Sequence, residues 1–405
     1  MKTIKIAIVG LGKRGYSLLK SVLLPLSTTE PIEITALCDV YPDRTEKAAE
    51  LVATLGHPRP ILYTDYREAL QYGDVDAVLI SSAWESHVEI AVYAMRAGIA
   101  VAMEVGGAYT VEQCFELVKV YEETKTPFMF LENCCFGRRE MMILNMKEKG
   151  VLGEIVHCSG GYCHDLRDEI ATGIEKRHYR LRNYLLRNAE NYPTHELGPI
   201  AKILGINRGN RMLTLTSTAS KAVSMHDYIE RNHADNNFLM NAKFAQGDIV
   251  TTVIKCAGGE TIVLTLDTTL PRYYSRGFTV RGTRGMYEEV TDSVFIDTEE
   301  NRKKDFTWRR DCVGNAADFA EEYDHSTWKD YLASGVQGTH DGMDYLEFKL
   351  FIDALKHGTP MPVDVYDAAA WMAITPLSEE SIACGGKPVM IPDFTNGKWV
   401  MNLID

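Results

Sequence analysis

The sequence predicts an α/β protein with two domains. Residues 1–130 are expected to form a Rossmann domain with a doubly wound parallel sheet, and residues 131–405 an α+β domain with a large, mostly antiparallel open sheet. Three observations predict this: a glycine-rich turn between an apolar run and a helical segment near the N-terminus, alternating strand and helix patterns up to about residue 130, and runs of period two beyond it.

The first apolar run, "TIKIAIVG", is typical of a parallel strand that is covered on both faces. It leads into G-x-G-x-x-G and then into the helical segment 16–26. The first glycine is expected to make the tight turn, the second to let a pyrophosphate approach the backbone, and the third to let the helix pack closely. The free N–H groups of the helix N-terminus also favour an anion. The residues expected to bind a dinucleotide here are Gly10, Gly12, Lys13, Arg14 and Gly15.

The second predicted strand, "IEITALCDV", ends at Asp39. A carboxylate at this place accepts hydrogen bonds from an adenosine ribose and repels a 2'-phosphate, which favours NAD over NADP. Arg44 follows a few residues later and weakens that preference, because an arginine is what an NADP site uses. The cofactor predicted from these residues is NAD.

The strand and helix patterns continue to alternate up to residue 133. In such a sheet, ligands bind outside the carboxyl ends of the strands. His87, which begins a helical segment, could equally be a residue that only hydrogen-bonds the backbone. The further residues expected near the cofactor are Ser82, Trp84, His87, Glu104 and Asn133.

The composition excludes several partners. A net charge of -13 disfavours a nucleic acid, and no uncharged apolar run is long enough to span a bilayer. The nine cysteines form no C-x-x-C pair and the chain starts without a leader pattern, so we expect a cytoplasmic protein. His164 and Asp165 are adjacent, but no third ligand stands at a recognisable spacing, and no metal site is expected.

The segment "RAGIAVAMEV" resembles the A-G-K-H-V-x-x-E-K-P motif of the Gfo/Idh/MocA oxidoreductases. The resemblance also covers the N-terminal fingerprint and the larger sheet domain. In that superfamily the lysine of Glu-Lys-Pro usually helps to handle the proton of the alcohol that is oxidised. Val105 stands in its place here, and this departure argues against simple dehydrogenation.

Further segments resemble one branch of that superfamily, the NAD-dependent α-N-acetylgalactosaminidases of glycoside hydrolase family 109. The matching stretches cover nearly the whole chain in order: "EVGGA", "LENCCFGRREMMILNM", "GYCHDLR", "NYPTHELGP", "DTTLPRYYSRG", "GMDYL", "DVYDAAAW" and "PDFTNGKW". The stretch between "HDLR" and "NYPTH" is shorter than is typical of the family.

The resemblance implies a glycosidase in which bound NAD removes a hydride from C3 of the sugar. The ketone acidifies the C2 proton, a base removes it, the aglycone leaves C1, water adds and the hydride returns. The alternative is an NAD-dependent sugar or polyol dehydrogenase that releases NADH. A protein that only senses sugar or NAD is a third possibility, since a Rossmann domain alone would suffice.

The resemblance also implies the site residues. Tyr192 and His195 are three residues apart, which places them on one face of a helical turn, and His195 is the candidate proton relay for the C3 hydroxyl. Alternatively, the tyrosines only pack, and the histidine braces its helix. The implied partners are a small glycoside and further copies of the chain, joined through the open sheet face. The implied catalytic residues are Tyr162, Tyr192, His195 and Tyr274, and the implied substrate-binding residues are Glu132 and Arg180. Arg182 is an equal candidate for the place of Arg180.

Overall fold

The computed structural model describes residues 2–303 and 311–401, and these fall into two compact units. The first unit contains the described residues of Met1–Phe136 and Tyr331–Ala369, and the second those of Gly137–Asp330 and Ala370–Ile404. The sequence predicts that all residues beyond 130 belong to the second domain. The structure instead groups the internal segment Tyr331–Ala369 with the unit that contains the glycine-rich turn.

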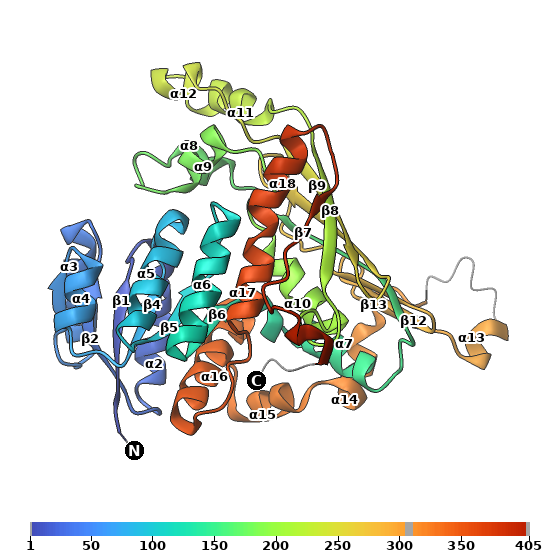
Figure 1. Ribbon diagram of the computed structural model, residues 1–405, viewed down its shortest axis with the longest axis horizontal. Helices are drawn as coiled ribbons and strands as arrows, with labels where there is room; N and C mark the ends of the chain where they lie inside the picture. The colour runs from blue at the N-terminus through green and yellow to red at the C-terminus, as the bar shows by residue number, and fades with distance from the viewer. Residues whose placement is uncertain (1, 304–310, 402–405) are drawn as a thin grey trace. The chain divides into compact units, whose positions relative to one another are not determined.

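The first unit is built on a parallel six-stranded sheet with the strand order β3-β2-β1-β4-β5-β6 (Figure 1). This order, with its reversal between β1 and β4, is that of a Rossmann fold, and it confirms the predicted fold class. The strands are β1 Ile4–Val9, β2 Ile32–Cys38, β3 Ile61–Tyr63, β4 Ala77–Ile80, β5 Ala100–Glu104 and β6 Phe128–Leu131.

The helices of this unit follow the strands in the predicted alternation. The helix after β1 contains a π-helical turn, and the helix after β5 begins with a capping box in which Thr110 and Gln113 satisfy each other's backbone N–H groups. The helices are α1 Lys13–Leu18, η1 Leu19–Leu23, α2 Leu24–Leu26, α3 Pro42–Thr54, α4 Tyr66–Tyr72, α5 Trp84–Arg96, α6 Val111–Thr124, η2 Asn133–Phe136, η5 His340–Gly342 and α16 Met343–His357. Of these, α16 packs against both η1 and η2.

The second unit is built on an eight-stranded sheet with the strand order β13-β12-β11-β7-β10-β9-β8-β14. All neighbouring strands are antiparallel except β7 and β10, which are parallel, so the predicted, mostly antiparallel sheet is confirmed. The strands are β7 Ile155–Cys163, β8 Met212–Ala219, β9 Ile249–Cys256, β10 Thr261–Asp267, β11 Thr279–Gly282, β12 Gly285–Glu288, β13 Ser293–Ile296 and β14 Val389–Met390.

Helices cover one face of this sheet. On β10, Ile262 and Leu264 are fully buried, whereas Val263 between them is only partly buried, because successive side chains point to opposite faces. Two helices, α10 Thr194–Leu204 and α18 Ile374–Ala383, pack on β7 and β8 (Figure 1). The other helices are α7 Arg138–Glu148, α8 Arg167–Ala171, α9 Arg180–Leu186, α11 Ser224–Asn232, α12 Asn237–Asn241, α13 Glu299–Lys303, η4 Asn315–Phe319, α14 Ala320–Tyr323, α15 Ser326–Ser334, α17 Val365–Met372 and η6 Lys398–Met401. Of these, α15 and α17 each have residues in both units.

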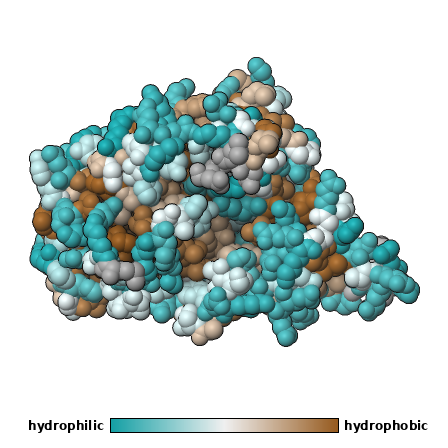
Figure 2. Space-filling view, turned by 60° about the horizontal axis from the view of Figure 1, so that its bottom comes forward, coloured by the Kyte–Doolittle hydropathy of each residue, from teal (hydrophilic) through white to brown (hydrophobic). Residues whose placement is uncertain are grey.

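The surface reflects the acidic, polar composition. On the face drawn in Figure 2, hydrophilic residues cover most of the area and hydrophobic residues show in several separate places. Within the described residues, no helix combines the length and apolar character needed to cross a bilayer.

Candidate functional site

The glycine-rich turn after β1 leaves open space where a pyrophosphate would bind. Gly10 has a φ of +95°, and a Cβ atom on it would lie 2.4 Å from the backbone nitrogen of Ser82. A Cβ atom on Gly15 would lie 2.0 Å from the Gly10 carbonyl oxygen, so both positions require glycine. At Gly12, in contrast, the nearest atom is Nη1 of Arg44 at 3.6 Å. The middle glycine therefore lies beside open space, which fits a dinucleotide.

Asp39 follows β2 and braces the same turn. Its carboxylate accepts hydrogen bonds from the backbone N–H groups of Leu11, at 2.7 Å, and Tyr41, at 3.0 Å. Arg44 lies 3.6 Å from the same carboxylate. A carboxylate has about four lone-pair sites, so Asp39 can hold the turn and still accept hydrogen bonds from ribose hydroxyls.

Arg14 and two other predicted cofactor residues meet around Asp344. The Nε atom of Arg14 donates to Glu104 at 2.8 Å, and its two Nη atoms donate to Asp344 at 2.8 and 2.9 Å. Asn133 donates to the same carboxylate at 2.8 Å. Burial alone would raise the pKa of Asp344, but hydrogen bonds from His340 and Arg14 outweigh it and hold that pKa well below its usual value. Asp344 thus remains ionised, fixes Arg14 and Asn133 directly, and fixes Glu104 through Arg14.

His340 is a residue of this unit that sequence reasoning missed. Its Nδ1 atom lies 2.7 Å from Asp344, while 54% of its side chain is exposed. His340 and Asp341 both have left-handed backbone, with φ of +51° and +53°, which is strained for residues other than glycine. Asp344 thus orients an imidazole that solvent can reach. The available signal was a histidine between Gly338 and Gly342, two residues before the quoted "GMDYL".

Two residues at the start of α5 brace the ends of β4 and β5. The Nε2 atom of His87 lies 3.0 Å from the carbonyl oxygen of Ser82, and burial lowers the pKa of His87 to about 4, so its ring is neutral. These contacts match the backbone-bonding interpretation of His87. The indole of Trp84 lies where a side chain at position 106 would be, since a Cβ atom on Gly106 would lie 2.4 Å from Trp84 Cδ1. The first glycine of "EVGGA", Gly106, is thus required by the packing of Trp84.

The remaining predicted residues of the first unit lie in contrasting places. Glu132 follows β6, is fully buried, and accepts the backbone N–H of Cys134 at 3.1 Å. Lys13 is exposed at the first position of α1. The sugar-binding role of Glu132 and the cofactor-binding role of Lys13 remain predictions.

In the second unit, the structure brings the four predicted catalytic residues together. The rings of Tyr162 on β7 and Tyr192 before α10 lie 4.4 Å apart between centroids. The His195 ring is 5.5 Å from Tyr162, and its Nε2 atom is 3.5 Å from the Tyr192 hydroxyl. The ring of Tyr274, from the segment between β10 and β11, lies 6.4 Å from Tyr162. We call these four residues the aromatic cluster.

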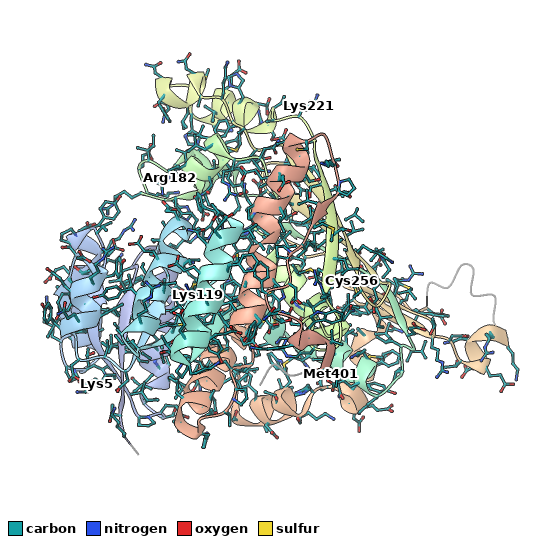
Figure 3. All side chains as sticks on the ribbon, in the orientation of Figure 1. Lys5, Lys119, Arg182, Lys221, Cys256 and Met401 are labelled. Carbon is teal, nitrogen blue, oxygen red and sulfur yellow. The ribbon has the colours of Figure 1, made fainter. Side chains whose placement is uncertain are left out.

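The structure separates the two candidate arginines. Arg180 is buried on α9, lies 3.1 Å from Glu169, and places its guanidinium over the rings of both Tyr162, at 5.8 Å, and Tyr192, at 5.2 Å. Arg182, on the same helix, is exposed (Figure 3). Arg180 is therefore the arginine that belongs to the aromatic cluster.

His164 also contacts the aromatic cluster, although sequence reasoning considered it only as an incomplete metal ligand. Its Nδ1 atom lies 3.0 Å from the Tyr162 hydroxyl, and its ring lies 5.2 Å from that of Tyr274. The neighbouring Asp165 instead pairs with Arg167 at 2.7 Å. His164 and Asp165 thus serve separate contacts.

Comparisons with known proteins divide the chain once, near residue 131, and keep Tyr331–Ala369 within the C-terminal part. Residues 136–401 match the family model for the glycosyl hydrolase 109 C-terminal domain, and residues 4–131 match the NAD-binding Rossmann fold of an oxidoreductase family. A glycosyl hydrolase family 109 protein of Stenotrophomonas maltophilia is 37% identical, covering 98% of this chain and 90% of the relative. An α-N-acetylgalactosaminidase of Tannerella forsythia is 38% identical, and the match covers 98% of this chain and 87% of that relative.

A solved structure shares the fold at much lower identity. The scyllo-inositol dehydrogenase of Lactobacillus casei, solved with NAD(H) and scyllo-inositol, aligns with a TM-score of 0.66 at 15% identity, covering 96% of this chain and 99% of that one. At this identity the likeness establishes the architecture and nothing about the substrate.

The bracing of the turn by Asp39 yields a prediction for the cofactor. Asp39→Ala should weaken NAD binding roughly tenfold to a hundredfold, as expected for lost hydrogen bonds to a charged group, and should narrow any preference over NADP. Titration calorimetry with both cofactors measures this. Glu33→Ala, which removes a carboxylate from β2 itself, is the control. Equal affinities of wild type and Asp39→Ala for both cofactors would refute the role of Asp39.

Proposed function

Because this chain belongs to glycoside hydrolase family 109, we propose that it hydrolyses α-N-acetylgalactosaminides or closely related glycosides by a redox-neutral route that uses bound NAD. The name of the Tannerella forsythia relative supports the choice of sugar. The open space beside Gly12 and the carboxylate of Asp39 support the choice of cofactor.

One observation carries the proposal: the chain has an aromatic cluster of tyrosines and a histidine, and the residue directly after Glu104 is Val105 and not a lysine. Val105 is buried and cannot exchange a proton. The Tyr192 hydroxyl and the Nε2 atom of His195, in contrast, lie 3.5 Å apart and can transfer a proton. Proton transfer is thus assigned to side chains of the second unit.

When bound, NAD supplies the hydride chemistry at C3 of the sugar, taking the hydride and later returning it to the same carbon. His195 accepts the proton of the C3 hydroxyl at Nε2, with the Tyr192 hydroxyl beside it to orient the ring or to carry the proton. With a ketone at C3, the C2 proton is acidic and a base can remove it as the aglycone leaves C1. Water then adds at C1, and His195 gives its proton back to the oxygen at C3.

The alternative function is an NAD-dependent sugar or polyol dehydrogenase that releases NADH. The shared fold allows it, since the solved structures with this architecture include such enzymes. The family match counts against it, because residues 136–401 match the C-terminal domain of glycoside hydrolase family 109.

The role of His195 can be tested by its removal. His195→Ala should lower turnover by about 10²- to 10⁴-fold, the usual contribution of a general acid or base, while the melting temperature and NAD affinity stay near wild type. Steady-state kinetics, thermal unfolding and calorimetry measure the three quantities. A loss of stability as marked as the loss of turnover would instead show that His195 braces α10.

The redox-neutral route itself predicts two linked results. With a chromogenic α-N-acetylgalactosaminide, the aglycone should be released over many turnovers without accumulation of NADH. In deuterated water, the product should carry deuterium at C2, because elimination removes that proton and re-addition takes one from solvent.

The competing routes give different patterns. A glycosidase with two carboxylates would release the aglycone and leave C2 unlabelled. A dehydrogenase would build up NADH in proportion to the substrate and release no aglycone. Either pattern would overturn the proposed function.

A further inference from the structure

Two tyrosine–histidine pairs of the second unit lie within hydrogen-bond distance beside each other, and one of them has no role so far. Tyr192 and His195 form the first, at 3.5 Å. Tyr162 and His164 form the second, at the shorter distance of 3.0 Å between the phenolic oxygen and Nδ1. The rings of Tyr162 and Tyr192 lie 4.4 Å apart, so the two pairs stand side by side.

The proposed function requires two proton transfers at neighbouring carbons. One proton leaves the C3 hydroxyl, and another leaves C2 during elimination. The two protons leave different atoms at different steps, the first as the C3 hydroxyl is oxidised and the second as the aglycone leaves C1. Two adjacent relays can serve the two atoms separately.

Tyr162 has the surroundings of a proton-transfer group. It is 6% exposed, and burial raises its pKa, but the guanidinium of Arg180 acts in the opposite direction. Arg180 lies over the Tyr162 ring at 5.8 Å and is itself held by Glu169. A cation beside the phenol stabilises negative charge that develops on its oxygen.

His164 connects this buried phenol with solvent. Its side chain is partly exposed, whereas Tyr162 is buried. Its position is fixed by a backbone hydrogen bond to the carbonyl of Asp267 at 2.9 Å and by the contact of its ring with Tyr274. As a neutral imidazole protonated at Nε2, His164 can accept the phenolic proton at Nδ1.

We propose that Tyr162 and His164 form the proton relay for C2 of the sugar, distinct from the Tyr192–His195 relay at C3. This inference rests on the proposed function. Tyr162 is the group that meets the substrate, and His164 acts through it.

The relay moves two protons during the elimination. The Tyr162 oxygen takes the C2 proton while its own proton passes to His164 Nδ1, and the C2–H electron pair forms the C1=C2 bond as the C1–O bond breaks. The leaving oxygen takes a proton from solvent. When water adds to C1, one of its protons returns to solvent, Tyr162 gives a proton to C2, and His164 returns the phenolic proton.

The test separates the C3 step from the C2 step in five variants: His164→Gln, His164→Gly, Tyr162→Phe, His195→Gln and, as a control, His157→Gln. His157 lies on the same strand, and its Nδ1 also bonds a hydroxyl, that of Thr261. Each variant, purified with its cofactor, is mixed rapidly with excess chromogenic glycoside. Absorbance of reduced nicotinamide reports C3 oxidation, release of the chromophore reports elimination, and thermal unfolding reports folding.

In His164→Gln and Tyr162→Phe, reduced nicotinamide should appear at a rate near that of wild type and persist, while aglycone release falls by about a hundredfold or more. In His195→Gln both signals should be lost, and in His157→Gln both should match wild type. Added imidazole should restore aglycone release to His164→Gly.

Three results would overturn the relay. They are a parallel loss of both signals in His164→Gln, an unchanged rate of aglycone release in that variant, and no response of His164→Gly to imidazole. A failure of the proposed function looks different, because wild type itself would then release no aglycone or would leave C2 unlabelled in deuterated water, and the relay would be overturned with it.

Discussion

The buried carboxylate of Asp344 is the constraint on which the nucleotide-binding unit depends. It is fully buried and binds Arg14 with two hydrogen bonds, Asn133 with a third and His340 with a fourth. Arg14 in turn holds Glu104 at the end of β5. An ionised carboxylate at this depth would be strongly destabilising without such partners. One charge thus fixes the glycine-rich turn, the ends of β5 and β6, and the start of α16 together.

The segment after Glu104, where the superfamily motif has a lysine, is closely packed in this chain. Val105 is buried, and Gly106 leaves the space that the indole of Trp84 fills. A charged side chain in this segment would need a partner and would compete with that packing. Proton handling is instead available from the aromatic cluster of the second unit, where Arg180 lies over two tyrosine rings.

The parts of the fold that depend on local pattern were predictable from the sequence. The glycine spacing and the alternation of strands and helices identified the Rossmann unit, and the spacing of Tyr192 and His195 placed their rings together. Contacts between distant segments were not predictable. Arg14 and Asp344 are 330 residues apart, so neither periodicity nor spacing links them. His164 was missed for a different reason: it was considered only as a metal ligand, although residues two apart on a strand share a face and Tyr162 is its partner.

The central claim, that the hydride leaves and returns to the same carbon, is tested most directly with a glycoside that carries deuterium at C3. After complete hydrolysis in ordinary water, the sugar product is analysed by mass spectrometry and NMR. The account predicts that deuterium is retained at C3, while in deuterated water C2 of an unlabelled substrate becomes labelled. Loss of deuterium from C3, or its appearance in a nicotinamide released to solution, would contradict the account.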